Sequence, residues 1–328
     1  MVDMATNGYT NGLPQETTSL IVPGKGHYVE NGRHYQLWHR GQYPFPIDED
    51  ELDRLDAMHK FVLVARGYLL YSPHIILDNI PNLKILDLGC GTGMWALDIA
   101  KKFFNGSSLV HGVDLSTQMQ ASEIFPNNDF RAMDIEEPWA SFLEESSYHL
   151  IYARMLAGSI HFDSWPRVYG EVFSHLVPGS GWVEQVEVDW YPCNDDGPVS
   201  DHLKFWADEL HSAMDLMKRP LRVDPHRTQQ MLADAGFVDI KQEVIRLPVN
   251  GGSLDPFEID VGRWFNLSLH KSFMGLSMAP LYRAKNWRPK DIERLEKDVL
   301  DEIAERGNRA YCKLYIWTAR RPPHHVPR

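Results

Sequence analysis

Short apolar runs and helical periodicities alternate along most of the chain, and they predict strands that alternate with helices. Residues 83–88 form an apolar run that ends in glycines, and apolar residues then recur at helical spacing from Ala96 to Phe103. The same reading places further strands at 109–113, 129–133, 148–155, 181–191, 238–249 and 310–319, and helices at 168–176, 201–217 and 226–235. Alternation of this kind predicts βαβ units and a mostly parallel sheet, which is an α/β fold.

Two helical regions flank this pattern. Asp48 and Glu51 have the spacing of a capping box, and residues 52–66 repeat apolar positions every three or four residues, which predicts an amphipathic helix. Residues 250–307 interrupt the last two strands with apolar and then charged helical sequence. We expect this insertion to form a lid over the carboxyl edge of the sheet. Its candidate pivots are Gly251, Gly252 and Gly262.

These patterns divide the chain into segments. In order, they are a tail at 1–27, a helical cap at 28–81, a core domain at 82–249, a helical insertion at 250–307, a final core strand at 308–321 and a tail at 322–328. We expect both tails to be disordered and solvated, including the adjacent His324 and His325. A chain of 328 residues is about twice the usual domain size, so one large domain or two small ones fit this organisation.

Composition and charge exclude several classes of protein. Hydrophobic residues make up 43% and charged residues 24%, which excludes wholesale disorder. The net charge of −12 argues against binding to nucleic acid or an anionic membrane, because both need a basic surface. Three distant cysteines suit neither a disulfide framework nor a zinc cluster, and no apolar stretch approaches the ~20 residues of a membrane span. We therefore expect a cytoplasmic protein without a metal, while a nuclear location stays open.

A glycine-rich turn follows the first predicted strand of the core. Asp87 precedes Gly89, Gly91 and Gly93, and a helix follows. Glycines at this junction let the backbone bend sharply and leave room for a ligand, while the helix N-terminus offers N–H donors. The third glycine comes one residue too early for a dinucleotide-binding motif, and no Gly-Lys-Ser/Thr follows to make a P-loop. The turn therefore predicts a ligand of another kind.

Acidic residues after the next strands indicate which ligand this is. Asp114 ends the second strand, where a carboxylate can accept both hydroxyls of a ribose. Asp134 and Ile135 follow the third strand, where they suit the amino group and the ring of an adenine. Asp87 would repel a pyrophosphate but suits an ammonium and a sulfonium. In chain order these acceptors describe S-adenosylmethionine; the alternative is an α/β domain that has a glycine-rich turn and no cofactor.

The chain carries a set of motifs at residues 86–93, 112–116, 134–139, 152–160 and 181–187, with further matches at 30–35, 48–59, 264–269 and 276–281. Together they resemble class I S-adenosylmethionine-dependent methyltransferases and, within that class, the fungal LaeA-like methyltransferases linked to secondary metabolism. The resemblance covers about residues 28 to 321, and it implies a Rossmann-like sheet of seven strands with the last one antiparallel. Two departures flank the expected acceptor side: an extra residue within 178–181, and a loop lengthened by His161 and Phe162.

The resemblance also implies a binding site for the cofactor. By motif position, the cofactor-binding residues are Asp87, Gly89, Cys90, Gly91 and Gly93 at the methionine portion, Asp114 and Leu115 at the ribose, Met133, Asp134 and Ile135 at the adenine, and in addition Met119 and Arg154. Arg154 ends the fourth strand and should lie near the sulfur of the cofactor. The product of the reaction would be S-adenosylhomocysteine.

Methyl transfer from a sulfonium depends mainly on alignment of the acceptor, because the donor is already activated. A hydroxyl or protonated amine acceptor also needs a base. His161, after the fourth strand, is the candidate catalytic base, with His270 and Glu187 as weaker candidates. The candidate substrate-binding residues are Trp264, Phe265 and Phe273. Their aromatic side chains would form an apolar wall over the substrate, and core packing is the alternative.

These features predict a methyltransferase that uses S-adenosylmethionine to methylate an oxygen or nitrogen atom of a small-molecule secondary metabolite. Two alternatives stay open. One is a LaeA-like nuclear regulator that acts through protein partners, although the acidic chain lacks a basic nuclear-import cluster and so favours the enzyme. The other is a methyltransferase-like fold that binds the cofactor and catalyses a rearrangement without methyl transfer.

Overall fold

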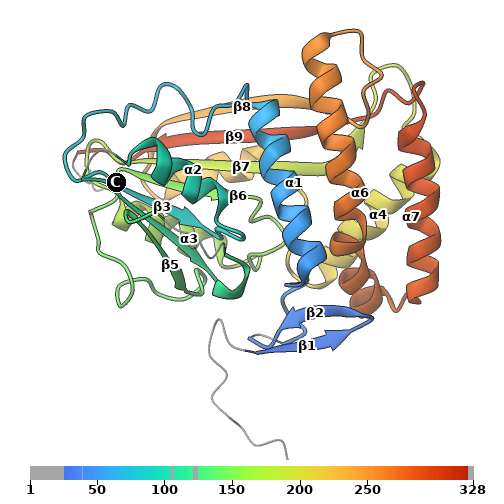
Figure 1. Ribbon diagram of the computed structural model, residues 1–328, viewed down its shortest axis with the longest axis horizontal. Helices are drawn as coiled ribbons and strands as arrows, with labels where there is room; N and C mark the ends of the chain where they lie inside the picture. The colour runs from blue at the N-terminus through green and yellow to red at the C-terminus, as the bar shows by residue number, and fades with distance from the viewer. Residues whose placement is uncertain (1–25, 39, 105–106, 121–124, 324–328) are drawn as a thin grey trace, which may run out of the picture.

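A seven-stranded sheet forms the centre of the protein (Figure 1). The computed structural model describes residues 26–38, 40–104, 107–120 and 125–323. The strands of the sheet are β3 (Lys84–Leu88), β4 (Leu109–Asp114), β5 (Asn128–Ala132), β6 (Leu150–Arg154), β7 (Trp182–Cys193), β8 (Val238–Pro248) and β9 (Tyr311–Arg320). Their order is β5-β4-β3-β6-β7-β9-β8, and β9 runs antiparallel to both of its neighbours. The predicted α/β sheet with an antiparallel last strand is therefore confirmed.

The register of the parallel strands brings their carboxyl ends to one edge of the sheet. Leu88 of β3 pairs with Val113 of β4 on one side and with Ala153 of β6 on the other. Asp114, the last residue of β4, pairs with Ala132 of β5. The loops that follow these strands therefore start at the same level, next to β3, where the strand order reverses. This is the edge at which open α/β sheets bind ligands.

Helices cover both faces of the sheet. Successive residues of β3 point to opposite faces, so Ile85 packs into one hydrophobic core and Leu86 into the other. The smaller helices are α2 (Met94–Lys102), α3 (Trp165–His175) and α5 (Pro225–Asp234). Residues of α3 and α5 belong to the core of Leu86, whereas Trp95 of α2 belongs to the core of Ile85 and stacks on Tyr152 of β6 with ring centroids 3.8 Å apart.

Four longer helices gather at one end of the sheet (Figure 1). They are α1 (Glu49–Ala65), α4 (Asp201–Leu216), α6 (Pro256–Lys285) and α7 (Pro289–Ala304). The helix α6 is 30 residues long and packs against the other three. Its Phe265 lies 5.1 Å from Phe61 of α1, and its Phe273 lies 5.0 Å from Trp206 of α4, between ring centroids. The helical layer therefore includes α4, which the sequence analysis assigned to the core domain.

The N-terminal cap is not wholly helical, which corrects the prediction for residues 28–81. Before α1 the chain forms a hairpin of β1 (His27–Glu30) and β2 (Arg33–Gln36). Its turn contains Asn31 and Gly32 at φ of 49° and 78°. Asn-Gly is a strong hairpin signal because both residues tolerate positive φ. The sequence contains this signal, but the prediction of a helical cap followed the stronger helical periodicity after Asp48.

Asp48 joins this hairpin to α1. Its Oδ1 accepts a hydrogen bond from the backbone N–H of Glu51 at 3.2 Å, as an N-cap residue does. Arg33 donates to the same carboxylate through Nε at 2.7 Å and Nη2 at 2.6 Å. The predicted cap is therefore present, and it also fixes where the hairpin meets the helix.

The inserted helices α6 and α7 leave and re-enter the sheet through a narrow neck. The side-chain amide of Asn250 donates to the carbonyl oxygens of Ile303, Glu305 and Asn308 at 3.1, 2.9 and 3.1 Å. A Cβ atom on Gly262 would lie 2.1 Å from the carbonyl oxygen of Asn250, so only glycine allows α6 to approach this closely. Gly262 is thus a packing residue, which corrects its prediction as a pivot.

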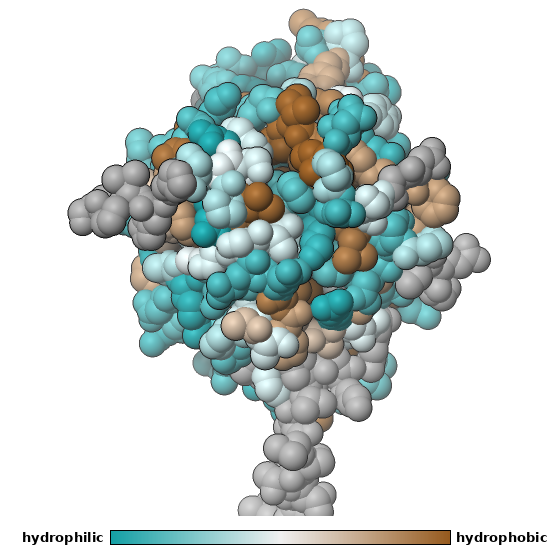
Figure 2. Space-filling model, turned by 90° about the vertical axis from the view of Figure 1, so that its left-hand side faces the viewer, coloured by the Kyte–Doolittle hydropathy of each residue, from teal (hydrophilic) through white to brown (hydrophobic). Residues whose placement is uncertain are grey.

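The surface at the end of the sheet opposite α7 mixes both residue classes. Figure 2 shows hydrophobic residues there in small groups between hydrophilic ones. Scattered apolar residues of this kind are common on protein surfaces and need no binding partner. Of the helices that the structure describes, none has both the length and the apolar character that a membrane span requires. The predicted tails fall almost entirely outside the described residues, and His324 and His325 lie there too.

Candidate active site

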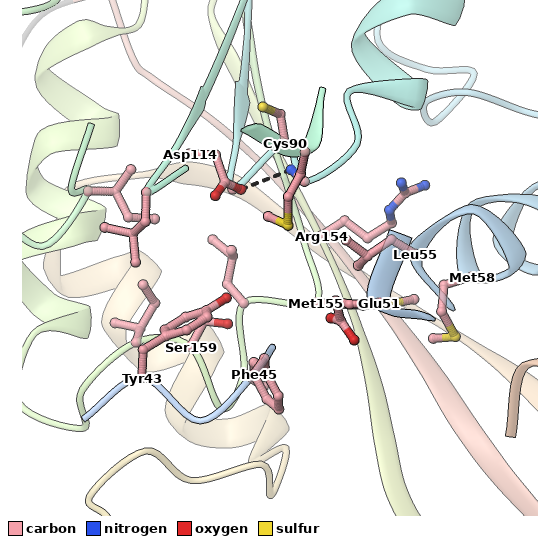
Figure 3. A pocket seen from close by; sticks show the side chains of 18 of the residues that line it. Tyr43, Phe45, Glu51, Leu55, Met58, Cys90, Asp114, Arg154, Met155 and Ser159 are labelled. Carbon is pink, nitrogen blue, oxygen red and sulfur yellow. Dashed lines mark hydrogen bonds between the residues drawn. The ribbon is translucent and has the colours of Figure 1, made fainter. Parts of the chain in front are cut away.

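A cavity lies at the carboxyl edge of β3, β4, β5 and β6 (Figure 3). Its space, including the open mouth, is about 1180 Å³. The loops after the strands form one wall. The segment before α1, with Tyr43 and Phe45, and the helices α1 and α6, with Met58 and Leu276, form the other. The cavity therefore lies between the sheet and the helical layer.

The structure brings most of the predicted cofactor residues to this cavity. Those that line it are Gly89, Cys90, Gly91, Asp114, Leu115, Met119, Met133, Asp134, Ile135 and Arg154. Two others stand behind the lining. Gly93 has a φ of 80° and begins α2, and a Cβ atom there would lie 2.4 Å from the ring of Phe130. Asp87 is buried below the glycine turn. Burial raises the pKa of its carboxyl group to about 7, although the positive charge of Arg154 acts in the opposite direction.

Asp114 ties the end of β4 to the glycine turn. Its Oδ2 accepts a hydrogen bond from the backbone N–H of Gly91 at 2.9 Å (Figure 3). Its Oδ1 accepts one from the backbone N–H of Ser116 at 3.2 Å. Burial raises the pKa of this carboxyl group, and the two N–H donors lower it. The carboxylate is therefore held in place at the rim of the turn.

Asp134 lines the part of the cavity next to the end of β5. Its Oδ1 accepts from the backbone N–H of Glu136 at 2.9 Å, and its Oδ2 accepts from the indole of Trp38 at 3.2 Å. Met133 and Ile135 beside it are buried and line the cavity. An acidic acceptor between apolar side chains suits an aromatic ring that carries an amino group.

Arg154 ends β6 and extends toward α1. Its Nη1 donates to Nδ1 of His59 at 3.2 Å, and Nε2 of His59 lies 3.0 Å from Oδ2 of Asp98. Among the described residues, no carboxylate lies within ion-pair distance of Arg154. Sequence analysis identified Arg154 but not His59, which reads as one more position on the amphipathic face of α1.

A buried ion pair lies in the wall formed by α1. Arg54 donates to both oxygens of Glu51, through Nε at 2.8 Å and Nη2 at 2.6 Å, and both side chains line the cavity. The capping-box spacing predicts that Glu51 reaches back to the start of the helix; it pairs forward with Arg54 instead. Beside this pair, Tyr43 shares a hydrogen bond with Ser159, and burial raises the pKa of its hydroxyl group.

Glu187 closes the cavity on the side of β7. Its oxygens accept from the backbone N–H groups of Leu156 and Ala157 at 3.1 and 3.2 Å and from the amide of Gln185 at 3.0 Å. Burial raises its pKa to about 7. Two of these donors belong to the loop after β6 and the third to β7, so the side chain of Glu187 ties this loop to the sheet whatever else it does.

The structure does not bring the candidate histidines to the cavity. The ring of His161 turns toward Asp163, whose backbone N–H donates to Nδ1 at 3.3 Å, and the side chain is partly exposed. His270 lies on α6, with Nδ1 at 2.8 Å from the carbonyl oxygen of Asn266. Neither residue belongs to the cavity lining.

The three candidate substrate-binding aromatics are also absent from the cavity lining. Phe265 and Phe273 are fully buried against Phe61 and Trp206, as described above, and Trp264 lies at the helix surface with Lys60 5.7 Å from its ring centroid. Trp190 of β7 lines the cavity instead, with Phe265 packed behind it at 6.1 Å. The predicted aromatic wall is thus replaced by Trp190 and by Leu276 of α6. In the described part of the chain, no group of three His, Cys, Asp or Glu side chains is arranged to hold a metal ion.

Comparison with known proteins agrees with this geometry. The model of the family "Methyltransferase domain" matches residues 59–242. The secondary metabolism regulator LAE1 of Cochliobolus heterostrophus is 41% identical over 318 residues, which cover 95% of this chain and 99% of that protein. The protein-methionine methyltransferase laeA of Emericella nidulans is 40% identical over 299 residues, 90% of this chain and 76% of that protein.

Among solved structures, the geranyl diphosphate C-methyltransferase of Streptomyces coelicolor aligns with a TM-score of 0.45 and 13% identity, covering 85% of this chain and 90% of that chain. The sheet order and the 41% identity to LAE1 over 95% of this chain are much stronger findings. The chain belongs to the fungal LaeA-like family of class I methyltransferases.

Proposed function

We propose that this protein binds S-adenosylmethionine in the cavity and transfers its methyl group to a protein acceptor. Binding of the cofactor in the cavity is supported by the placement of Asp114, Asp134 and the glycine turn along one edge of the sheet. Asp114 would accept the ribose hydroxyls, Asp134 the adenine amino group, and the turn would leave room for the methionine portion. Bound there, the cofactor supplies an electrophilic methyl carbon.

The charge of the cavity supports a cationic cofactor. Five carboxyl side chains line it, whereas the guanidinium groups that line it are those of Arg54 and Arg154. The carboxyl groups are Glu51, Asp114, Asp134, Glu136 and Glu187. Such a wall stabilises a sulfonium relative to the uncharged thioether of S-adenosylhomocysteine, because opposite charges attract more strongly in a partly desolvated site. The same difference favours release of the product.

The hydrogen bonds of these carboxylates favour an acceptor that needs no base. Glu51 pairs with Arg54, Glu136 accepts from Arg219, and the other three accept backbone N–H groups. The remaining wall near Phe45, Met155 and Leu276 is apolar. A thioether is uncharged and nucleophilic without losing a proton, so the sulfur of a methionine side chain fits this wall. The relative from Emericella nidulans carries the name of a protein-methionine methyltransferase.

A small-molecule oxygen or nitrogen acceptor is the second candidate, and Glu187 favours it. Its pKa of about 7 matches what a general base needs at neutral pH. The two candidates differ in their pH dependence. With saturating cofactor, methylation of a thioether should be flat across pH 7, whereas a reaction that uses Glu187 as its base should rise with pH through about 7.

The deciding experiment gives the purified chain a methyl-labelled cofactor together with either a protein extract or an extract of small metabolites. We expect label in protein, at methionine, as a sulfonium. The Asp114→Asn variant should lose labelling and bind S-adenosylhomocysteine about a hundredfold more weakly, since one of the two hydrogen bonds is lost and the other keeps only an uncharged acceptor. The exposed Asp78→Asn is its control. Label that appears only in metabolites would select the second candidate, and a chain that binds no cofactor would refute both.

A further inference from the structure

Three side chains from three elements form a chain that ends at the cavity. Asp98 lies on α2, His59 on α1 and Arg154 at the end of β6. The His59 ring is buried and contacts both neighbours, at 3.0 Å to Asp98 Oδ2 and 3.2 Å to Arg154 Nη1. This places a residue of the helical layer in direct contact with a guanidinium that lines the cofactor edge.

The chemistry of the two neighbours fixes the proton on the imidazole. A guanidinium can only donate hydrogen bonds, so Nδ1 of His59 must accept from Arg154. The ring proton then lies on Nε2 and is donated to the carboxylate of Asp98. Burial lowers the pKa of His59 and so favours the neutral form of the ring. The contact with Asp98 acts in the opposite direction but does not outweigh burial. The ring is thus held in one tautomer and one orientation.

Arg154 has donors left over at the place where they are useful. Its contact with His59 uses one N–H of five, and among the described residues no carboxylate is near enough to form an ion pair with the others. The sheet register puts Arg154 one residue after Ala153, which pairs with Leu88 just before the glycine turn. A guanidinium binds a carboxylate well, because two of its parallel N–H groups match the two carboxylate oxygens.

Resting on the proposed function, we propose that Arg154 binds the carboxylate of the cofactor's amino-acid portion and that His59 is the positioning residue that aims it. The contact to Nδ1 holds the guanidinium at the end of β6 toward the glycine turn, and Asp98 holds the ring. Because His59 lies on the same helix as Leu55 and Met58, which line the cavity, α1 connects the cofactor's amino-acid end to the helical wall of the site.

Comparing two ligands distinguishes a role of Arg154 and His59 in cofactor binding from a role in folding. S-adenosylhomocysteine has the amino-acid portion, and 5′-methylthioadenosine lacks it while keeping adenine, ribose and sulfur. Calorimetry on the full chain gives both dissociation constants. Arg154→Met should weaken S-adenosylhomocysteine binding at least about tenfold, the loss of a charge-assisted hydrogen bond, and should change 5′-methylthioadenosine binding less than about twofold.

Two isosteric replacements of His59 divide its contacts. His59→Gln places an amide near the Nε2 position, so it keeps a partner for Asp98 and loses the acceptor for Arg154. His59→Asn keeps an oxygen near the Nδ1 position and loses the contact to Asp98. We expect His59→Gln to weaken S-adenosylhomocysteine binding about tenfold, His59→Asn to retain most of it, and both to bind 5′-methylthioadenosine as the native chain does.

The double variant His59→Gln/Arg154→Met decides whether His59 acts through Arg154. If it does, the double variant binds S-adenosylhomocysteine no more weakly than Arg154→Met alone. Additive losses, or an equal loss of both ligands in His59→Gln, would overturn the proposal and leave His59 as a packing residue. A native chain that binds 5′-methylthioadenosine, with Arg154→Met unchanged toward S-adenosylhomocysteine, refutes this proposal alone. A native chain that binds neither ligand refutes the proposed function with it.

Discussion

Trp38 donates its indole N–H to the carboxylate of Asp134, with 3.2 Å between Nε1 and Oδ2, although the two residues are 96 positions apart in the chain. The contact brings the segment that follows the β1–β2 hairpin onto the acidic residue expected at the adenine. Asp134 is therefore oriented from two sides, by Trp38 and by the backbone of its own loop. The N-terminal region thus contributes to the cavity at Asp134 and, through Tyr43 and Phe45, at the opposite wall.

Replacing Trp38 by phenylalanine should weaken binding of adenosine-containing ligands. The ring remains, but Asp134 loses one of the donors that orient it, and we expect the dissociation constant of S-adenosylhomocysteine to rise about fivefold to tenfold. Calorimetry measures this directly. Trp287→Phe is the matched control, because Trp287 packs on Phe205 outside the cavity. Unchanged affinity in Trp38→Phe would mean that the indole N–H does not contribute to the adenine end.

The contribution of Asp87 and Glu187 to stability should fall as pH rises from about 4 to about 7. Burial raises the pKa of Asp87 and of Glu187 to about 7, from ordinary values of 3.8 and 4.5. In this window the folded chain keeps both protons and the unfolded chain releases them. The stability linked to them is therefore complete at low pH and is lost as pH passes about 7.

Urea unfolding at several pH values across this window measures the slope. Asp87→Asn removes one of the two groups, so the unfolding free energy of the native chain minus that of the variant should fall as pH rises across the window. Buried histidines whose pKa is lowered, such as His111 and His211, act in the opposite direction, which is why the difference between the two proteins is the informative quantity. Parallel curves would contradict the raised pKa of Asp87.

Arg283 of α6 should be needed for acceptor methylation more than for cofactor binding. It donates to Glu30 at 2.7 Å, to Tyr28 at 2.9 Å and to the backbone oxygen of Tyr43 at 2.8 Å. Arg283→Met would release the hairpin and the Tyr43 segment that lines the cavity. We expect methyl transfer to fall about tenfold or more, from the loss of aligned geometry, with little change in S-adenosylhomocysteine affinity.

The matched control for Arg283 is Arg263→Met on the same helix, because Arg263 is exposed and contacts only the equally exposed Asp260 among the ion pairs of the described residues. Labelled-methyl transfer and calorimetry on both variants give the comparison. An equal loss of transfer in the two variants, or a loss of cofactor affinity equal to the loss of transfer, would argue against a role for the hairpin at the acceptor end.

Two neighbouring residues of α6 should behave differently. Leu276 lines the cavity, whereas Phe273 packs against Trp206 in the core. Leu276→Ala should raise the KM of the acceptor severalfold. Phe273→Leu should lower the free energy of unfolding by about 1–3 kcal/mol and leave that KM unchanged. Steady-state kinetics and urea unfolding measure the two effects, and an acceptor KM that responds to Phe273→Leu would place the substrate deeper in the helical layer.

The sheet and the residues at its carboxyl edge were predictable because their signals are local. The strand before Gly89 and the strand that ends in Asp114 each fix the position of a turn within a short stretch of sequence. The parallel topology then brings these ends together without further information. Each residue of this edge therefore follows from its own position in a motif.

The acceptor side was not predictable in the same way. Phe265 and Trp190 are both aromatic and both surrounded by apolar residues, and only three-dimensional packing puts Trp190 at the cavity and Phe265 behind it. Glu51 satisfied a capping pattern while its side chain forms a buried ion pair. His59 fitted an apolar periodicity while its two nitrogens bridge different elements. Such roles depend on partners that are distant in sequence.

The neck at Asn250 lets the two-helix insertion vary in length without changing the strands of the sheet. Because the chain leaves and re-enters the sheet at one point, which a single amide closes with three hydrogen bonds, lengthening the excursion costs little, since loop-closure entropy grows only with the logarithm of length. Residues 250 and 308 are therefore the points at which added sequence would leave the order of the sheet strands intact, whereas α6 itself stays tied to α1, α4 and α7 by its packing.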